Sequence, residues 1–341
     1  MRNPIAFSFR GLVLIIAAFC LCVLPVESVA QTAVSLGTSS VGARFHVLAV
    51  GMGDVVSRHS KLNVTVEPIG GSDANVRALK AKRIDFALIN SLAATHGFRG
   101  IGSFEKEGKA PVRLILQGGL AARTLIARAD SGIRSPGDLR GKRVQGRRRA
   151  LADLEVVLKQ LLKVYGIPAS EVTIYAHSDT NEQVEAVRLG TAEAALMPFG
   201  SPKTSSPPIR RLAETVPLIV VDLGRDKIPA ILENPDLAGY AAVTIQKGAI
   251  KGMDNDVTSL ALGEYLVGRT DLSEETVYQF TKTFFTNLKN FHAVHASAKE
   301  YDVAGSLEEP TIPYHPGAVR YYKEAGRWDA AMAGLQSKLL K

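Results

Sequence analysis

The sequence of 341 residues is long enough for two domains of ordinary size. Its composition, 46% hydrophobic and 22% charged, excludes an intrinsically disordered chain. The formal net charge of +8 favours anionic partners, a class that includes nucleic acid, anionic membrane surfaces and anionic solutes.

The first thirty residues have the features of a secretory signal peptide. Arg2 and Arg10 precede the apolar run GLVLIIAAFCLCVL, and the small residues of SVA indicate a cut after Ala30. The run is shorter than the ~20 residues that span a bilayer, which argues against the alternative of a retained membrane anchor. We therefore expect a periplasmic mature chain that does not span the membrane.

Export limits the chemistry of the mature chain. Both cysteines lie in the leader, so disulfides, thiolate metal sites and cysteine nucleophiles are excluded. Loss of two arginines and one glutamate lowers the net charge to +7. Nucleic acid is an unsuitable partner outside the cytoplasm, which leaves anionic solutes or an unspecific surface charge.

The first half of the mature chain alternates strands and helices. Strands are predicted over 33–37, 62–68 and 84–90, with Pro68 ending the second. Apolar residues at helical spacing predict a helix from Phe45 to Val56, and a second helix contains Val76 and Leu79. This β-α-β-α-β order is typical of a parallel sheet covered by helices.

The remaining elements continue this alternation. Strands are predicted at 112–117, 124–130, 172–176 and 191–200, and helices at 152–166, 181–190 and 272–291. Ser135 and Pro136 have the pattern of a helix start. A last helix follows the segment TIPYHP.

One helix–strand unit occurs twice. Asn75–Asn90 aligns without gaps to Gln183–Pro198, with four identities and four conservative pairs over 16 positions. Chance similarity between amphipathic units is one explanation. The other is a pair of α/β lobes of similar build, with a cleft between them.

Five segments resemble the TAXI family, the solute-binding subunits of TRAP transporters. They are GTSSVGARFHVLAVG, GGSDANVRALKAKRIDFALINS, RADSGIRSPGDLRGKRV, AAVTIQKGAIKGMDNDV and TIPYHPGAVRYYKEAG, in the family's order across roughly Val34 to Gly326. The resemblance implies a type II periplasmic binding fold, capture of a small organic anion such as glutamate or a dicarboxylate, and delivery to separate TRAP membrane subunits without an ATPase.

The chain departs from the family after GKRV. Members usually carry a Gly-Ser-Gly-Thr-type loop that lines the ligand cleft on the second lobe, whereas this chain reads QGRRRALAD. Arginines of this run offer bidentate contacts to a carboxylate or phosphonate. The alternative is a solvated surface loop. We include Arg147 and Arg148 among the predicted ligand residues.

Two small-residue loops, TSSVG and GGSD, each connect a strand to a helix. Such loops let an anion approach the unpaired N–H groups of the first helical turn, where the helix dipole adds about half a positive charge. Ligands bind at this edge of open α/β sheets. The alternative is that the glycines only permit tight turns and that Ser72 or Asp73 only caps. We predict a first-lobe ligand site of ten residues: Thr38, Ser39, Ser40, Gly42, Phe45, Gly70, Gly71, Ser72, Asn90 and Ser91.

The repeated unit predicts the opposite side of this site. Phe199 and Gly200 occupy the place of Ser91 in the alignment, so we expect them to face the cleft from the second lobe, unless they form an ordinary turn. No metalloprotease, nucleophile-elbow, phosphate-loop or dinucleotide motif is complete in the sequence. We therefore expect no catalysis, no cofactor and no metal.

The predicted fold class is α/β, a bilobed type II periplasmic binding protein with parallel or mixed sheets joined by hinge strands. The expected parts are the signal peptide 1–30, a first lobe of 31–127 and 260–341, and a second lobe of 128–259. We expect a monomer that delivers a small organic anion to TRAP membrane subunits. The alternatives are an ABC-type receptor of the nitrate or sulfonate class, an orphan periplasmic sensor partner and an exported enzyme.

Overall fold

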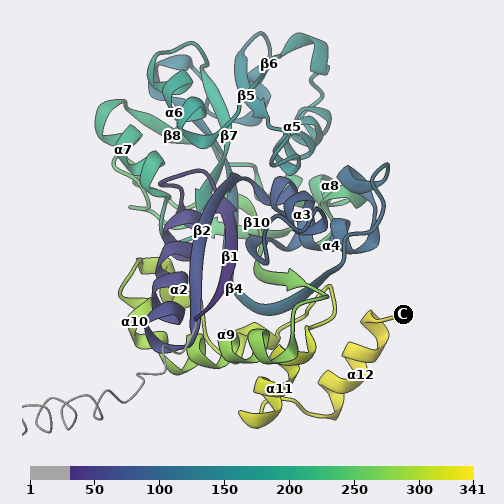
Figure 1. Ribbon diagram of the computed structural model, residues 1–341. Coiled ribbons are helices and arrows are strands. Elements are labelled where there is room, and N and C mark those ends of the chain that lie inside the picture. The colour runs from purple at the N-terminus through teal and green to yellow at the C-terminus, as the bar shows by residue number, and fades with distance from the viewer. Residues whose placement is uncertain (1–30) are drawn as a thin grey trace, which may run out of the picture. The chain divides into compact units, whose positions relative to one another are not determined.

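Ten strands pair into one mixed sheet in the order β2-β1-β3-β10-β4-β7-β5-β6, with β8 added to β4 and β9 added to β10 (Figure 1). The strands are β1 (Thr32–Ser39), β2 (Leu62–Gly70), β3 (Phe86–Asn90), β4 (Val112–Arg128), β5 (Arg143–Arg147), β6 (Thr173–Ala176), β7 (Ala194–Gly200), β8 (Leu218–Val220), β9 (Ala241–Ile245) and β10 (Val257–Arg269). The predicted α/β class is confirmed.

The computed structural model describes residues 31–341, of which Thr32–Lys341 form one compact unit. The expected signal peptide and its cut after Ala30 lie outside the described residues. Between residues 31 and 341, no helix has the length and apolar character needed to cross a bilayer. The helices are α2 (Arg44–His59), α3 (Ser72–Lys80), α4 (Ser91–Arg99), α5 (Asp153–Val164), α6 (Thr180–Arg188), α7 (Pro207–Thr215), α8 (Ile228–Leu232), α9 (Glu274–Thr286), α10 (Leu288–His292), α11 (Pro316–Glu324) and α12 (Ala330–Leu339).

The predicted β-α-β-α-β start is confirmed. β1 pairs in parallel with β2 and β3, and α2 lies against β1 and β2 (Figure 1). Pro68 does not end β2, which continues to Gly70. β2 is the edge strand of the sheet, where a residue without an N–H group is tolerated.

β4 is one continuous strand of 17 residues, where the sequence predicted two strands. Gly118 and Gly119 lie between the two predicted strands and allow close packing. A Cβ atom on Gly118 would lie 2.2 Å from the ring of Tyr301, and one on Gly119 would lie 2.0 Å from the carboxylate of Glu300. The antiparallel pairing of β4 with β10 shifts register opposite these glycines, between Gly263 and Tyr265, and then continues.

Buried apolar side chains form three clusters along this sheet. The first core takes Val112–Leu116 from β4 and Tyr265–Val267 from β10, with residues of β1, β2, β3, α2, α3 and α9. The second core surrounds α5, and the third lies beside α7; both include later residues of β4 and earlier residues of β10. The packing thus changes after Leu116 on β4 and before Tyr265 on β10. The domain limits stay a prediction.

The two copies of the repeated unit have the same secondary structure. In the alignment, α3 begins and ends at the same positions as α6, and β3 begins at the same position as β7. β3 pairs with β10 and β7 pairs with β4, each in antiparallel register. The alignment therefore predicted matching elements, which argues against chance similarity.

The predicted helix start at Ser135 and Pro136 is confirmed, because Ser135 caps a short 3-10 helix that begins at Pro136. Two other predictions at element ends were wrong. The long helix that starts after Ser273 is interrupted at Asn287, where α10 begins. α11 is followed by α12, whose start is capped by Asp329.

Candidate functional site

A cavity lies where several strands end and several helices begin. Its volume is about 50 Å³. Its walls come from β1, α2, the β2–α3 junction, β3 and β4, and from the segments around β5, α6, β7 and α7. The lining residues are Ser39, Ala43, Arg44, Phe45, Gly70, Gly71, Ser72, Leu88, Ala121, Arg123, Arg148, Leu151, Thr180, Pro198, Gly200 and Ser206.

Three helices begin at this cavity without a side-chain cap. α7 starts with Pro207 and Pro208, which have no N–H group, and in α3 the N–H of Asp73 is paired with Ala150, so the unpaired N–H groups come mainly from the first turns of α2 and α3. The residues before the first turns of α2, α3 and α7 are Ala43, Gly71 and Ser206, and none of them makes a side-chain capping bond. All three line the cavity. The hydroxyl of Ser206, a residue only 3% exposed, has no hydrogen-bond partner. Unpaired N–H groups and helix dipoles directed at one space favour a negative charge there.

Arg148 brings a formal positive charge to the same cavity. Its guanidinium donates to Ser40 Oγ at 2.8 Å, to Thr180 Oγ1 at 3.1 Å and to the carbonyl of Gly70. All three acceptors are neutral, and its Nε has no partner. Arg148 is 3% exposed, and burial lowers its pKa to about 10, so it stays charged at neutral pH. Across residues 31–341, no carboxylate lies within ion-pair distance of this guanidinium.

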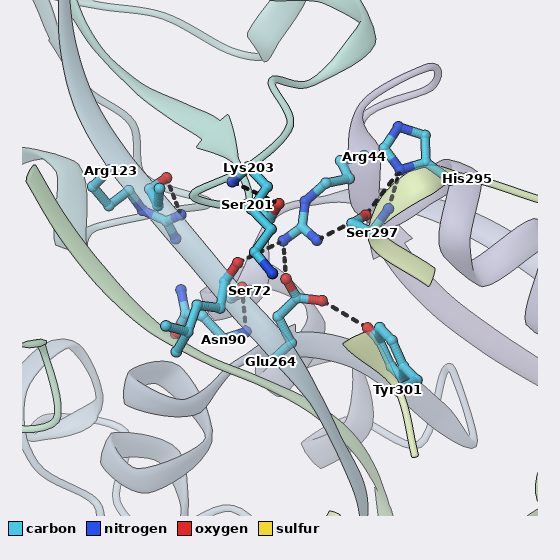
Figure 2. Close-up of polar contacts among 12 residues, drawn as sticks. Arg44, Ser72, Asn90, Arg123, Ser201, Lys203, Glu264, His295, Ser297 and Tyr301 are labelled. Carbon is cyan, nitrogen blue, oxygen red and sulfur yellow. Dashed lines mark hydrogen bonds and ion pairs between the residues drawn. The ribbon is translucent and has the colours of Figure 1, made fainter. Parts of the chain in front are cut away.

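Arg44 differs because it has a carboxylate behind it. Its Nη2 pairs with Glu264 Oε1, and the hydroxyl of Tyr301 donates to Glu264 Oε2 at 2.7 Å (Figure 2). Nη1 donates to Ser297 Oγ at 3.3 Å. Glu264 is fully buried and does not line the cavity. The charge of Arg44 is therefore neutralised from behind, and its guanidinium is held in place.

Arg123 on β4 repeats this arrangement. Its Nε donates to Asp153 Oδ2 at 2.6 Å, and Tyr240 donates its hydroxyl to the same oxygen at 2.5 Å. Asp153 is 5% exposed and also lies outside the cavity lining. The cavity therefore holds three arginines but one uncompensated charge, that of Arg148.

Seven of the predicted ligand residues line the cavity: Ser39, Phe45, Gly70, Gly71, Ser72, Arg148 and Gly200. Ser40 does not line it but accepts the hydrogen bond from Arg148. Thr38 is fully buried in β1, and its carbonyl accepts from Asn75 Nδ2. Gly42, at φ +75°, shapes the loop before α2.

Four other predicted residues lie away from the cavity for local reasons. Asn90 caps α4, because its Oδ1 accepts from the N–H of Ala93 at 2.7 Å. Ser91 is the first residue of that unpredicted helix. Phe199 packs in the third core. Arg147 is half exposed and pairs with Glu155 at 3.1 Å.

Sequence reasoning missed Arg44, Arg123 and their carboxylates. A signal was present, because Arg123 and Glu264 are single charges inside the apolar runs LAARTLIA and LALGEYLV. Charged residues are almost never buried without a partner, so each implied a hidden one. Thr180 had a weaker signal, as a small polar residue directly before the predicted helix 181–190. Ser206 precedes α7, a helix that the sequence analysis did not predict.

A direct contact joins the β2–α3 junction to the segment before α5. The N–H of Asp73 donates to the carbonyl of Ala150 at 3.2 Å, and its carboxylate accepts from the N–H of Ala152 at 3.1 Å. A Cβ on Gly71 would lie 2.1 Å from the same Ala150 oxygen. Gly71 has an extended φ of 178°, so a glycine is needed here for the close approach and not for backbone conformation.

A second cavity of about 300 Å³ is lined by Asp73, Asn90 and Asp153 among others. Within residues 31–341, no three His, Asp or Glu side chains are grouped to hold a metal ion. The first cavity is therefore the site with the clearest ligand chemistry, a concave space with positive charge and donors that the protein leaves unused.

Solved structures share this fold. The binding component of an ABC phosphonate transporter from Pseudomonas aeruginosa is 14% identical, with 91% of this chain and 97% of that chain covered and a TM-score of 0.53. The ligand-binding component of an ABC-type import system from Staphylococcus aureus, solved with zinc bound, is 13% identical, with 87% and 92% covered and a TM-score of 0.50. At these identities the likeness shows the fold alone, and it confirms the type II periplasmic binding protein architecture. A family model matches residues 36–326, and the chain belongs to the NMT1-like family.

Proposed function

We propose that this protein is an exported solute-binding receptor that closes two lobes over a small organic anion and delivers it to a membrane transporter. The observation that carries the proposal is the convergence of the uncapped N-termini of α2 and α3 and the guanidinium of Arg148, which has no carboxylate partner, on one cavity. An isolated buried charge is unfavourable, so a ligand that supplies the missing negative charge would favour the closed form.

The cavity walls come from two regions of the chain that could move apart and close again. Arg148 follows β5, yet it donates to Ser40 and Gly70, which follow β1 and end β2. We place the proposed hinge where the packing changes, at Gln117–Leu120 on β4 and Gly263–Glu264 on β10. Movement there would separate the two walls while leaving each core intact.

The proposal is tested by a thermal-shift screen of the purified protein with amino acids, dicarboxylates, keto acids and short monocarboxylates. A ligand at a hundred times its dissociation constant is expected to stabilise the protein by about 2.7 kcal/mol. Sodium chloride at the same ionic strength serves as the control for screening of surface charges. If no organic anion raises the melting temperature above this control, the receptor proposal fails.

We propose an ABC-type importer as the membrane partner. The relatives with a TM-score of 0.50 or more whose activity is named are ABC import components, which supports this choice. The resemblance to TAXI subunits favours the second candidate, a TRAP transporter. Uptake into proteoliposomes that hold the candidate transporter should depend on internal ATP for the first and on an ion gradient for the second. Uptake without ATP would reject the ABC partner.

A further inference from the structure

We infer that the ligand is a short organic acid of about two to four carbons that carries one negative charge and no amino group. This inference rests on the proposed function, because it describes the ligand of the same cavity. It differs from the amino acids and dicarboxylates that the family resemblance implies. Three features of the cavity support it. They are the number of arginines without a carboxylate partner, the absence of acidic residues from the lining, and the size and polarity of the space.

The number of uncompensated charges indicates a single anionic group. Arg44 and Arg123 are each neutralised by a buried carboxylate, Glu264 and Asp153. Each carboxylate also receives a tyrosine hydroxyl, so it is fixed on its arginine. Only Arg148 faces neutral acceptors alone. One carboxylate or sulfonate group therefore balances the buried charge of the site, and a second would be buried without a formal counter-charge.

The absence of acidic lining argues against an amino group. None of the residues that line the cavity is aspartate or glutamate. Glu264 and Asp153 are occupied by arginines and lie outside the lining. Asp179, the carboxylate that most favours the charged form of Arg148, accepts hydrogen bonds at the start of α6 and also lies outside the lining. An ammonium group would therefore be desolvated beside the unpaired guanidinium of Arg148 with no counter-charge, and like charges in a low-dielectric site repel strongly.

The size and polarity of the cavity limit the rest of the ligand. The cavity volume of about 50 Å³ is a few times the ~10–15 Å³ that a single water molecule needs, so the cavity favours a small ligand. Acetate, propionate and pyruvate meet this limit better than the larger glutamate and succinate. Phe45, Leu88, Leu151 and Pro198 form the apolar part of the lining, which suits a short aliphatic body.

Matched pairs of probes test the inference by isothermal titration on the purified protein. Propionate is compared with β-alanine, and ethanesulfonate with taurine; the members of each pair differ by one terminal ammonium group. We expect propionate or ethanesulfonate to bind at least tenfold more tightly than its amino counterpart. Whichever of propionate and ethanesulfonate binds more tightly shows whether the preferred head group is a carboxylate or a sulfonate. Succinate and glutamate are expected to bind at least tenfold more weakly than the best short acid.

The outcomes separate this inference from the proposed function. Preferential binding of glutamate, succinate or β-alanine would overturn the assigned ligand class while supporting an anion receptor. Absence of binding by every anion would overturn both.

Variants of Arg148 test the role of the uncompensated charge. Arg148→Met should weaken binding of the best short acid tenfold or more, and Arg148→Lys, which keeps the charge but loses the planar fork, should give a smaller loss. Arg58→Met is the matched control, since Arg58 is an exposed arginine paired with Asp54 on the surface of α2. Equal affinities for Arg148→Lys, Arg148→Met and Arg58→Met would reject Arg148 as the anion partner.

Discussion

Asp73 shows how one residue can link the site to pH. It is 4% exposed, accepts hydrogen bonds from Ser103 and from the N–H of Ala152, and lies near the like charge of Asp153. Burial raises the pKa of its carboxyl to about 6. Its unfolded value is about 3.9, so between these values the folded protein holds a proton that the unfolded chain has lost. The contribution to stability is therefore present at low pH and is lost as the pH rises through 6.

Asp73→Asn should remove this pH dependence, because an amide can keep both hydrogen bonds without a charge. We expect the free energy of unfolding of the variant, relative to the native protein, to rise by about 1 kcal/mol between pH 5 and pH 7.5. Urea unfolding of the variant and of the native protein at the two pH values measures this difference. The contributions of the other titrating groups are the same in both proteins and cancel. A difference that stays constant with pH would show that Asp73 titrates as in the unfolded chain.

At the residue scale, the predicted residues line the cavity where a local loop determines their position, and their contact with a ligand stays a prediction. Ser39, Gly70, Gly71 and Ser72 belong to strand–helix junctions, and such junctions meet at one edge of a parallel sheet. Prediction failed where neighbouring residues point in opposite directions. Arg147 and Arg148 are adjacent, and successive side chains at a strand end alternate faces, so the sequence could not show which arginine is buried.

At the scale of elements, the start of α3 is the contact point between the two walls of the cavity. Asp73 holds the segment before α5 through its N–H and its carboxylate, while Gly71 leaves room for the carbonyl of Ala150. Any side chain at position 71 would meet this carbonyl before the two walls reach their observed distance.

Gly71→Ala should therefore hold the walls apart while leaving α3 folded. We expect at least tenfold weaker binding of the best anion, with a melting temperature close to that of the native protein without ligand. Gly334→Ala is the matched control, because a Cβ there meets nothing within 4 Å. This exchange should stabilise α12 by about 0.5–1 kcal/mol and leave affinity unchanged. Native affinity in Gly71→Ala would exclude a role for this contact in closure.

Element prediction failed where packing overrode a local signal. The sequence predicted two strands on either side of Gly118 and Gly119, yet β4 passes through these glycines, where the Tyr301 ring and the Glu300 side chain occupy the space of a Cβ. α4 was missed because its first turn follows directly from β3, and its cap, Asn90, looked like a free donor at a sheet edge. Both corrections depend on neighbours that are distant in sequence.

At the scale of the molecule, the repeated helix–strand unit was the strongest guide to architecture. It predicted that β3 and β7 have equivalent roles, and both now flank the crossing pair of β4 and β10. The sequence could not predict the state of the cavity, because its volume depends on how closely two separately packed regions approach.

The two arginine–carboxylate–tyrosine triplets have a consequence for how such receptors diverge. Glu264 and Asp153 stand behind Arg44 and Arg123 and do not line the cavity, yet they determine how much positive charge remains for the proposed ligand. A substitution at a residue outside the cavity lining can therefore change the charge of the ligand that the cavity prefers. Relatives with the same contact surface but a neutral side chain at either position would recruit more highly charged nutrients.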